Sequence, residues 1–166
     1  MIITDEYESF ILKSILVEDI ESLRVWKNKH RGSFFHKNEI TSSEQYTWFS
    51  EYQNDPENIM FVVIVDGVSI GCMGYRLKDG GVDVYNIMRG EKTSHKPFKM
   101  SDAFSVMLSY LKVKYQLTIS CVVLNDNPAF NWYLNNNFIV KAKYDNYSLL
   151  EYYSGNNMKK YLIKVK

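Results

Sequence analysis

The sequence predicts an α/β fold of the mixed-sheet (α+β) kind, in which an antiparallel meander precedes a parallel strand–helix–strand crossover and helices cover both faces. Three β-rich runs separated by tight turns occupy residues 58–88 and predict the meander. Residues 101–135 then give a helical pattern, a buried strand and a second helix, an order that requires a parallel connection. A mixed central sheet between helices satisfies both demands.

The chain is predicted to begin with a strand and a short helix. Residues 9–16 have the apolar content of a strand, with imperfect alternation. Asp19 can cap the helix that follows, because Ile20, Leu23 and Trp26 then recur at helical spacing.

A second helix is indicated by a capping box. Thr41 is followed three residues later by Glu44, so each side chain can bond the backbone N–H of the other. Tyr46, Phe49 and Gln53 then recur at one-turn intervals and predict the face that packs on the protein.

The meander is predicted from turn residues and β-branched runs. Residues 58–65 form the first strand, and Asp66-Gly67 is the strongest short hairpin signal in the sequence. Residues 68–77 return as the second strand, 78–81 form another turn, and 82–88 form the third strand.

The second half alternates between helix and strand. Residues 89–99 are polar and aperiodic, and Ser101 can cap the next helix. A buried strand follows at residues 117–124, and then a short helix at 129–135 that ends at the Asn pair 136–137. Residues 138–166 are predicted to form two or three strands, with a turn at 154–157.

Composition excludes several classes of protein. The 166 residues suit one domain spanning 1–166, and 46% hydrophobic with 23% charged residues is typical of globular chains. Because 20 Lys+Arg face 19 Asp+Glu, we expect no nucleic-acid partner.

The longest apolar run, 59–65, is too short to span a membrane, and no secretory signal follows Met1, so we expect a cytoplasmic protein. Cys72 and Cys121 are expected to be buried, reduced thiols.

One segment carries a recognisable motif. Residues 122–138 read VVLNDNPAFNWYLNNNF, a strand and turn followed by a helix with Ala129 and Tyr133 four residues apart and then Phe138. This pattern, with an element order that covers nearly the whole chain, resembles the GNAT superfamily of acyl-CoA-dependent N-acetyltransferases. Asn137 stands where that family commonly has Gly. The resemblance implies acetyl-CoA as co-substrate and Tyr133 as the general acid that protonates the departing thiolate.

The asparagine that the family has after this strand can be matched to more than one position here. Strict counting places it on Asp126, with Asn125 and Asn127 on either side. We favour Asn127 as a cofactor-binding residue.

A second stretch resembles the family's phosphate-binding loop. The strand at 82–89 is followed in the family by Gln/Arg-x-x-Gly-x-Gly/Ala and a helix, where residues 95–100 here read HKPFKM. Phe98 and Met100 therefore replace the two glycines. Backbone amides at a helix start bind anions, so the resemblance still implies that Lys99, Met100 and Ser101 face the CoA diphosphate, with Lys96 or Lys99 adding charge.

The resemblance also implies how the thioester is addressed. Backbone N–H groups of Ile87, Met88 and Arg89 would face its carbonyl, in a gap between the strand and its parallel neighbour. Asp83, the carboxylate within the predicted strand, is a candidate general base, although a solvated edge carboxylate explains it equally well. Glu39 and Glu44 are alternatives.

The acceptor is indicated by the N-terminal part. Residues 24–28 and 34–49 look like the opening of GNAT members that acetylate nucleotide-linked amino sugars, and ribosomal-protein N-terminal acetyltransferases share part of it. Phe35, His36 and Trp48 are candidate acceptor-binding residues, as are Trp26 and Phe34, although core packing also explains the aromatic ones.

The sequence thus predicts transfer of an acetyl group to a small primary amine, an amino sugar first. A protein N-terminus as acceptor and a non-catalytic GNAT-fold module remain alternatives. His30, His36 and His95 are not spaced as metal ligands, so no metal is expected. We expect no membrane partner, and aromatic-rich terminal strands are compatible with a homodimer.

Overall fold

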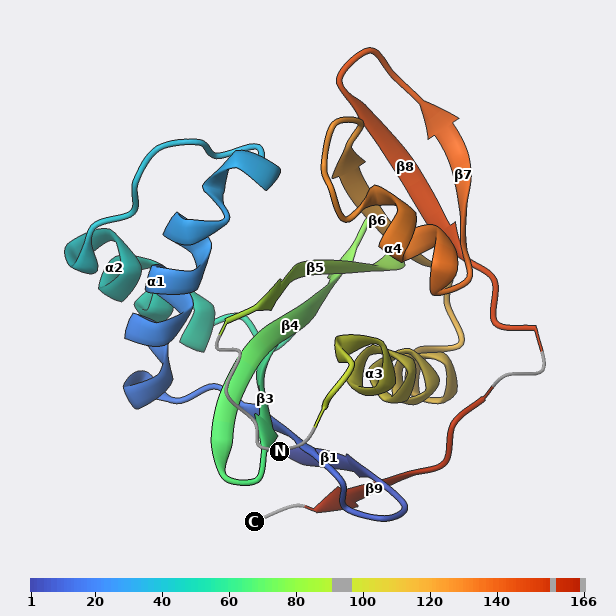
Figure 1. Ribbon diagram of the computed structural model, residues 1–166, viewed down its shortest axis with the longest axis horizontal. Coiled ribbons are helices and arrows are strands. Elements are labelled where there is room, and N and C mark those ends of the chain that lie inside the picture. Colours follow the sequence, from blue (N-terminus) through green and yellow to red (C-terminus); the bar gives the residue numbers. More distant parts are fainter. Residues whose placement is uncertain (91–96, 156–157, 165–166) are drawn as a thin grey trace.

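A mixed sheet forms the centre of the computed structural model, which describes residues 1–90, 97–155 and 158–164. Within these ranges it has nine strands in the order β7-β8-β6-β5-β4-β3-β2-β1-β9 (Figure 1). The predicted α/β class with a mixed sheet is confirmed. The strands are β1 Ile2–Asp5, β2 Ile11–Ser14, β3 Asn58–Val65, β4 Val68–Lys78, β5 Gly81–Arg89, β6 Ile119–Leu124, β7 Phe138–Lys143, β8 Tyr147–Tyr152 and β9 Tyr161–Lys164.

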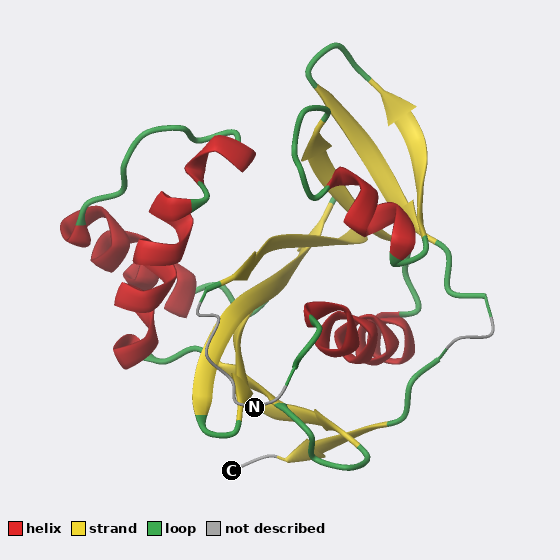
Figure 2. Ribbon diagram, in the orientation of Figure 1, coloured by secondary structure: helices red, strands yellow, loops and turns green. Residues whose placement is uncertain are grey.

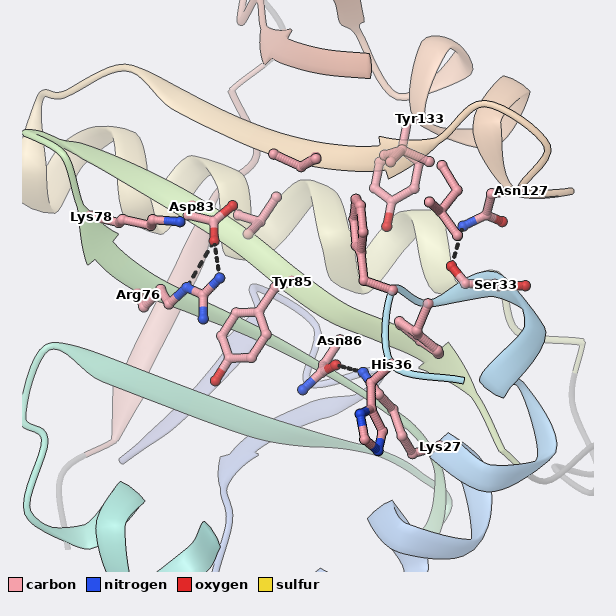
Figure 3. A pocket seen from close by; sticks show the side chains of 16 residues that line it. Lys27, Ser33, His36, Arg76, Lys78, Asp83, Tyr85, Asn86, Asn127 and Tyr133 are labelled. Carbon is pink, nitrogen blue, oxygen red and sulfur yellow. Dashed lines mark hydrogen bonds and ion pairs between the residues drawn. The ribbon is translucent and has the colours of Figure 1, made fainter. Parts of the chain in front are cut away.

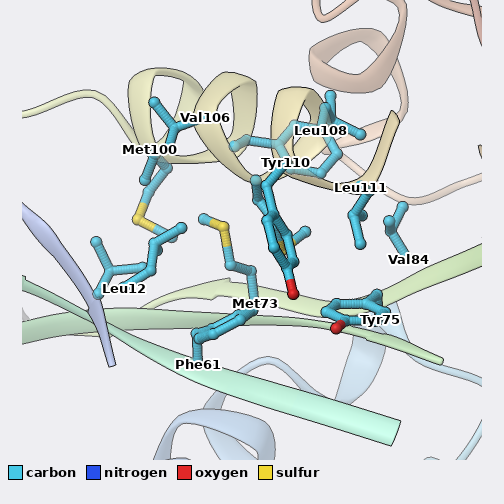
Figure 4. Close-up of a cluster of buried hydrophobic side chains, with 14 of the residues drawn as sticks. Leu12, Phe61, Met73, Tyr75, Val84, Met100, Val106, Leu108, Tyr110 and Leu111 are labelled. Carbon is cyan, nitrogen blue, oxygen red and sulfur yellow. The ribbon is translucent and has the colours of Figure 1, made fainter. Parts of the chain in front are cut away.

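Helices cover both faces of the sheet (Figure 2). Helices α1 (Ile20–Lys29) and α2 (Ser42–Gln53) lie on one face, while α3 (Met100–Tyr115) lies on the other and α4 (Phe130–Asn135) lies beside β7. Each face has its own core. Figure 4 shows the larger one, where α3 packs on the inner strands.

The meander has the predicted boundaries to within one residue at nearly every end. At the β3–β4 turn, Asp66 (φ 50°) and Gly67 (φ 78°) both take the left-handed conformation that a type I′ hairpin needs. At the helix end before β7, Asn137 (φ 64°) takes the same conformation, as the Asn pair predicts.

Two predicted helix caps are wrong. Asp19 precedes α1, but its carboxylate accepts from the Leu16 N–H at 2.8 Å and pairs with Lys13 at 3.1 Å instead of capping the helix. Ser101 lies inside α3, which begins one residue earlier at Met100. The Asp19 carboxylate turns toward β2 because the Leu16 amide and the Lys13 ammonium group both lie within reach there.

The predicted capping box of α2 is confirmed. The Glu44 N–H donates to Thr41 Oγ1 at 3.2 Å, and the Thr41 N–H donates to Glu44 Oε2 at 2.7 Å. The predicted packing face is only partly right. Phe49 is buried, but Tyr46 is 56% exposed and Gln45 is buried in its place, because the Gln45 amide reaches the Ile20 carbonyl at 3.2 Å.

The N-terminal part contains a strand that the sequence analysis missed. β1 pairs antiparallel with both β2 and β9, and the strand predicted over 9–16 is the shorter β2. In the second half, β6 begins later than predicted, at Ile119, and α4 begins at Phe130. Residues 95 and 96 of the predicted phosphate loop, and half of the turn at 154–157, lie outside the described residues.

The sheet parts between its two parallel strands. In the described residues, β5 and β6 pair at Val82↔Ile119 and Asp83↔Ser120, near the start of each strand. Beyond these pairs β5 continues to Arg89 along β4, whereas β6 follows β8. The result is an opening between the carboxyl halves of β5 and β6, the usual location of ligands in sheets with parallel strands.

Candidate active site

A β-bulge lies in β5 beside this opening. Gly74 pairs with Tyr85 and Cys72 with Met88, so Asn86 and Ile87 together face one residue of β4. Asn86 has a φ of 50°, and its carbonyl accepts from the Cys72 thiol at 3.3 Å. The bulge interrupts the ladder between β4 and β5 beside the opening.

Glycine is required behind the bulge. A Cβ at Gly71 would lie 2.3 Å from the Met88 carbonyl oxygen, which is backbone and cannot turn away. β4 therefore approaches this part of β5 more closely than any side chain would permit.

The central pocket is a cavity of about 420 Å³ in the opening between β5 and β6 (Figure 3). Strands β4, β5 and β6 supply its floor and walls, and the segment 33–36 after α1 covers it. Its lining residues are Lys27, Ser33, Phe34, Phe35, His36, Arg76, Lys78, Asp83, Val84, Tyr85, Asn86, Val122, Val123, Leu124, Asn127 and Tyr133.

Tyr133 directs its hydroxyl into the central pocket from α4 (Figure 3). The residue is 9% exposed, and Trp132 and Phe138 pack edge-on against its ring at 5.2 and 5.9 Å between centroids. Burial raises the pKa of Tyr133 above its usual value near 10, and the nearby Cys121 and Asp83 raise it further. The hydroxyl therefore stays protonated at neutral pH and can donate a hydrogen bond.

Asp83 lies in the same pocket but is held by an arginine. Arg76 lies opposite it on β4 and contacts Asp83 Oδ2 through both Nε and Nη2 at 2.8 Å. The Arg76 guanidinium also lies 4.7 Å above the ring of Tyr85, whose hydroxyl donates to Asn58 Oδ1 at 2.5 Å. This cluster joins β3, β4 and β5 and gives Asp83 a structural role beside any chemical one.

Lys27 extends from α1 to the bulge and was not anticipated from the sequence. Its ammonium group hydrogen-bonds Asn86 Oδ1 and lies 3.4 Å from the ring centroid of Phe34. Burial lowers the pKa of Lys27 to about 8. The available signal was that Lys27 follows the buried Leu23 by four residues and so shares its helix face.

The side pocket, a cavity of about 340 Å³, lies between α1, α2 and the bulge. Trp48 lines it and stacks on Tyr52 with 5.3 Å between centroids. Lys27, His36 and Asn86 line both this pocket and the central one. Of the five predicted acceptor residues, Phe34, Phe35 and His36 line the central pocket and Trp48 lines the side pocket. Trp26 lines neither of these pockets and is buried in the core under α1.

The helix-end pocket is a cavity of about 510 Å³ between the end of β5, the start of α3 and α4. It brings together most of the residues predicted to bind the cofactor, and Tyr133 lines both this pocket and the central pocket. Its lining residues are Ile87, Arg89, Phe98, Lys99, Met100, Ser101, Ala129, Trp132 and Tyr133.

Phe98 forms part of the wall of this pocket. Its ring packs on Phe10 with 5.3 Å between centroids, and its carbonyl accepts from Arg89 Nη1 at 2.6 Å. Met100, at the other glycine position, is 8% exposed and belongs to the core under α3. Both bulky residues are therefore accommodated by packing that leaves the cavity open.

Two predicted cofactor residues do not line the helix-end pocket. Met88 is buried in the core under α1 and lines the side pocket, since alternate residues of a strand face opposite sides of the sheet. Asn127 lines the central pocket, where its Oδ1 accepts from the Ala129 N–H at 2.8 Å and its Nδ2 donates to the Ser33 carbonyl at 3.2 Å.

The remaining candidates lie away from the pockets or are already engaged. Glu39 is exposed, and the Glu44 carboxylate is bound in the capping box. Cys72 and Cys121 are buried free thiols, as predicted. Within the described ranges, His, Cys, Asp and Glu side chains nowhere gather in threes that could hold a metal ion, and no helix is long and apolar enough to cross a membrane.

Solved structures with the same architecture were found. A nucleotide-linked sugar GNAT, FdhC, has a TM-score of 0.73 at 12% identity over 90% of this chain and 89% of its own. A variant of the spermidine N-acetyltransferase SpeG of Vibrio cholerae has a TM-score of 0.71 at 14% identity, covering 90% and 96% of the two chains. The chain has the GNAT N-acetyltransferase fold.

A third example supports the same assignment. The N-acetyltransferase PseH of Campylobacter jejuni has a TM-score of 0.63 at 14% identity, over 95% of this chain and 99% of its own. No protein-family model matches the sequence, and no curated protein matches it either. At these identities the likeness establishes the fold. The names of FdhC and SpeG refer to nucleotide-linked sugars and to spermidine, and these substrates are those of the named proteins.

Proposed function

We propose that the protein is an acyl-CoA-dependent N-acetyltransferase that acetylates the primary amine of a small molecule. The observation that carries this proposal is the meeting of two cavities at Tyr133, in the opening between β5 and β6. One cavity ends at the start of α3 and the other at the segment after α1. Such an arrangement admits two substrates from opposite sides and joins them at one hydroxyl group.

The helix-end pocket suits the cofactor arm. Acetyl-CoA supplies an activated thioester and a diphosphate. The first amides of α3 lack partners within the helix and can receive the diphosphate, with Lys99 beside them. Asp102, an acidic residue in the same turn, lines a different cavity together with Asp5 and Glu6. Phe98 and Met100 remove the flexibility of glycine but not the space.

The backbone at the bulge suits the thioester carbonyl. Ile87 and Arg89 line the helix-end pocket, and N–H groups freed from the β4 ladder can donate to a developing oxyanion. We assign this role to the backbone of Ile87, Met88 and Arg89. Side-chain identity at these positions is not required by the proposal.

Proton transfer is assigned to Tyr133 and Asp83. The Tyr133 hydroxyl donates to the sulfur as the thiolate departs, which its protonated state permits. Asp83 takes the amine proton, directly or through water, from its place beside Arg76. Both side chains line the central pocket.

An amino sugar is the first choice of acceptor, and Phe35, His36 and Trp48 are the residues we expect to bind it. Their positions around two adjoining cavities support this choice, since a sugar stacks on aromatic rings and hydrogen-bonds imidazole. A protein N-terminus is the alternative. The replacement of both loop glycines favours a second candidate, a non-catalytic module of the same fold.

Ligand-induced stabilisation separates these candidates. Acetyl-CoA or CoA at about 100 times its Kd stabilises a protein that binds it by about 2.7 kcal/mol, seen as a rise in Tm. A thiol-release assay with amino sugars, spermidine and N-terminal peptides then identifies the acceptor class. Stabilisation without release by any amine supports the module, and no stabilisation by either ligand contradicts acyl-CoA binding.

A further inference from the structure

The central pocket has an uneven distribution of charge. Among its lining residues in the described part of the chain, Lys27, Arg76 and Lys78 carry positive charge and Asp83 carries negative charge. Figure 3 shows that Arg76 points at Asp83, and its Nε and Nη2 both contact Asp83 Oδ2 at 2.8 Å. Because the charges of Arg76 and Asp83 offset each other, the remaining charge among these residues is the positive charge of Lys27 and Lys78.

Lys27 is the half-buried member of this pair of lysines, and Lys78 is exposed. Its ammonium group contacts Asn86 Oδ1 and the face of the Phe34 ring, both of which are uncharged. No carboxylate of the described residues lies within 4.0 Å of it. Glu44 lines the adjoining side pocket, but its carboxylate is bound to the Thr41 N–H and hydroxyl at 2.7 and 2.9 Å.

A partly desolvated ammonium group without a counterion is a costly arrangement. Burial disfavours the charged form, which lowers the pKa of Lys27 to about 8. An anion that enters the pocket would supply the missing charge and be held more strongly than at the surface, because the surrounding dielectric is low. A cation entering the same space would meet repulsion.

We propose that the acceptor carries an anionic phosphate or carboxylate group in addition to its amine, and that Lys27 binds this group in the central pocket. The inference rests on the proposed acetyltransferase function and narrows its substrate class. Lys78, exposed at the rim of the pocket, adds to the attraction. The same charge disfavours polyamines as acceptors.

Lys27 and Tyr133 line the central pocket from different elements, so the place for the anionic group is distinct from the place of acetyl transfer. Lys27 lies at the wall shared by the central and side pockets, and Tyr133 enters the central pocket from α4. An acceptor held at both places would span the pocket with its amine toward Tyr133 and its anionic group toward α1. Lys27 is thus a specificity-determining residue.

Matched acceptors test the charge preference. Thiol release from saturating acetyl-CoA is measured with glucosamine, glucosamine 1-phosphate, glucosamine 6-phosphate, muramic acid and spermidine. We expect kcat/KM for at least one anionic amino sugar to exceed that of glucosamine about tenfold or more, which corresponds to about 1.4 kcal/mol. Spermidine should be the poorest acceptor. The phosphate and carboxylate arms show which anion is used.

Three variants test the residue. Lys27→Met preserves length and removes charge, and it should reduce the preference for the anionic sugar over glucosamine to about twofold or less, while Lys27→Arg should retain a preference. Lys29→Met is the matched control, because Lys29 is an exposed lysine of the same helix that lines neither pocket. It should leave the preference unchanged.

The outcomes distinguish the two proposals. Thiol release by no amine, with no stabilisation by acetyl-CoA, overturns the acetyltransferase. Release with glucosamine or spermidine at least as efficient as with every anionic sugar overturns the anionic acceptor and leaves the acetyltransferase standing. A preference that persists in folded Lys27→Met overturns the role of Lys27.

Discussion

The helix-end pocket and the central pocket meet at one tyrosine but are built in different ways. The helix-end pocket is formed by three short stretches of chain: Ile87 and Arg89 at the end of β5, the consecutive residues 98–101, and residues 129–133 at α4. The central pocket draws side chains from α1, β4, β5, β6 and the turn before α4. A site for an invariant cofactor can rest on backbone geometry, whereas a site that selects an acceptor requires particular side chains.

The largest expected effect lies where the two pockets meet. Tyr133→Phe removes the hydroxyl and keeps the ring packing, so kcat should fall about 100-fold while KM for acetyl-CoA changes less than about threefold. Steady-state kinetics with acetyl-CoA and the best acceptor measure both. Tyr152→Phe is the control, because Tyr152 packs on Phe138 from β8 and lines neither pocket. A kcat that is unchanged in Tyr133→Phe would remove this residue from the mechanism.

The second prediction concerns the charge of Lys27, which lines the central pocket. The folded protein holds the pKa of Lys27 at about 8, below its ordinary value of 10.5, so the unfolded chain binds the proton more tightly. Stability should therefore rise with pH above 8. Relative to Lys27→Met, the wild type should gain about 2 kcal/mol between pH 7.5 and 9.5 in urea unfolding.

The same measurement has a built-in control. Lys29→Met removes an exposed charge from the same helix and should follow the wild-type dependence on pH. If Lys27→Met and the wild type gain or lose stability in parallel, the Lys27 ammonium is not held in a desolvated place, and the electrostatic difference between the pockets is smaller than argued.

The same division explains what could be predicted from the sequence. The helix-end residues Phe98–Ser101 were anticipated because they follow one another in the chain and resemble a known loop. Lys27 and Asn86 lie 59 positions apart in the sequence and come into contact only in the fold, between α1 and the bulge of β5. Asn86 in mid-strand was a usable signal, since Asn is depleted in strands and favoured at left-handed positions.

The fold shows a similar contrast. The meander and the capping box of α2 were predicted nearly to the residue, because hairpin turns and caps depend on neighbours in sequence. β1 was missed because four residues carry too little pattern, and its pairing with β9 joins the two ends of the described chain. The side chain of Met88 lines the side pocket and not the helix-end pocket because the bulge shifts which residues of β5 face each side of the sheet, and the assignment of its backbone N–H stays a prediction.

A third, smaller effect is expected at the cover of the central pocket. Asn127 joins the turn before α4 to the segment after α1, through the Ala129 N–H and the Ser33 carbonyl. Asn127→Ala should cost about 1 kcal/mol of unfolding free energy and raise KM for the acceptor more than that for acetyl-CoA. Asn131→Ala, at an exposed position on α4, is the control. A selective rise in the acetyl-CoA KM would instead place Asn127 on the cofactor side.

The smallest effect is expected for a charged side chain in the helix-end pocket. Lys99 is exposed and contributes charge beside the α3 amides, so Lys99→Ala should raise the Kd for CoA only about two- to threefold, and less at high salt. Lys112→Ala, near the other end of α3, should have no effect. Titration calorimetry at two salt concentrations measures both. A loss beyond about tenfold in Lys99→Ala would mean that side-chain charge holds the diphosphate, and the helix-end pocket would then depend on particular side chains as much as the central pocket does.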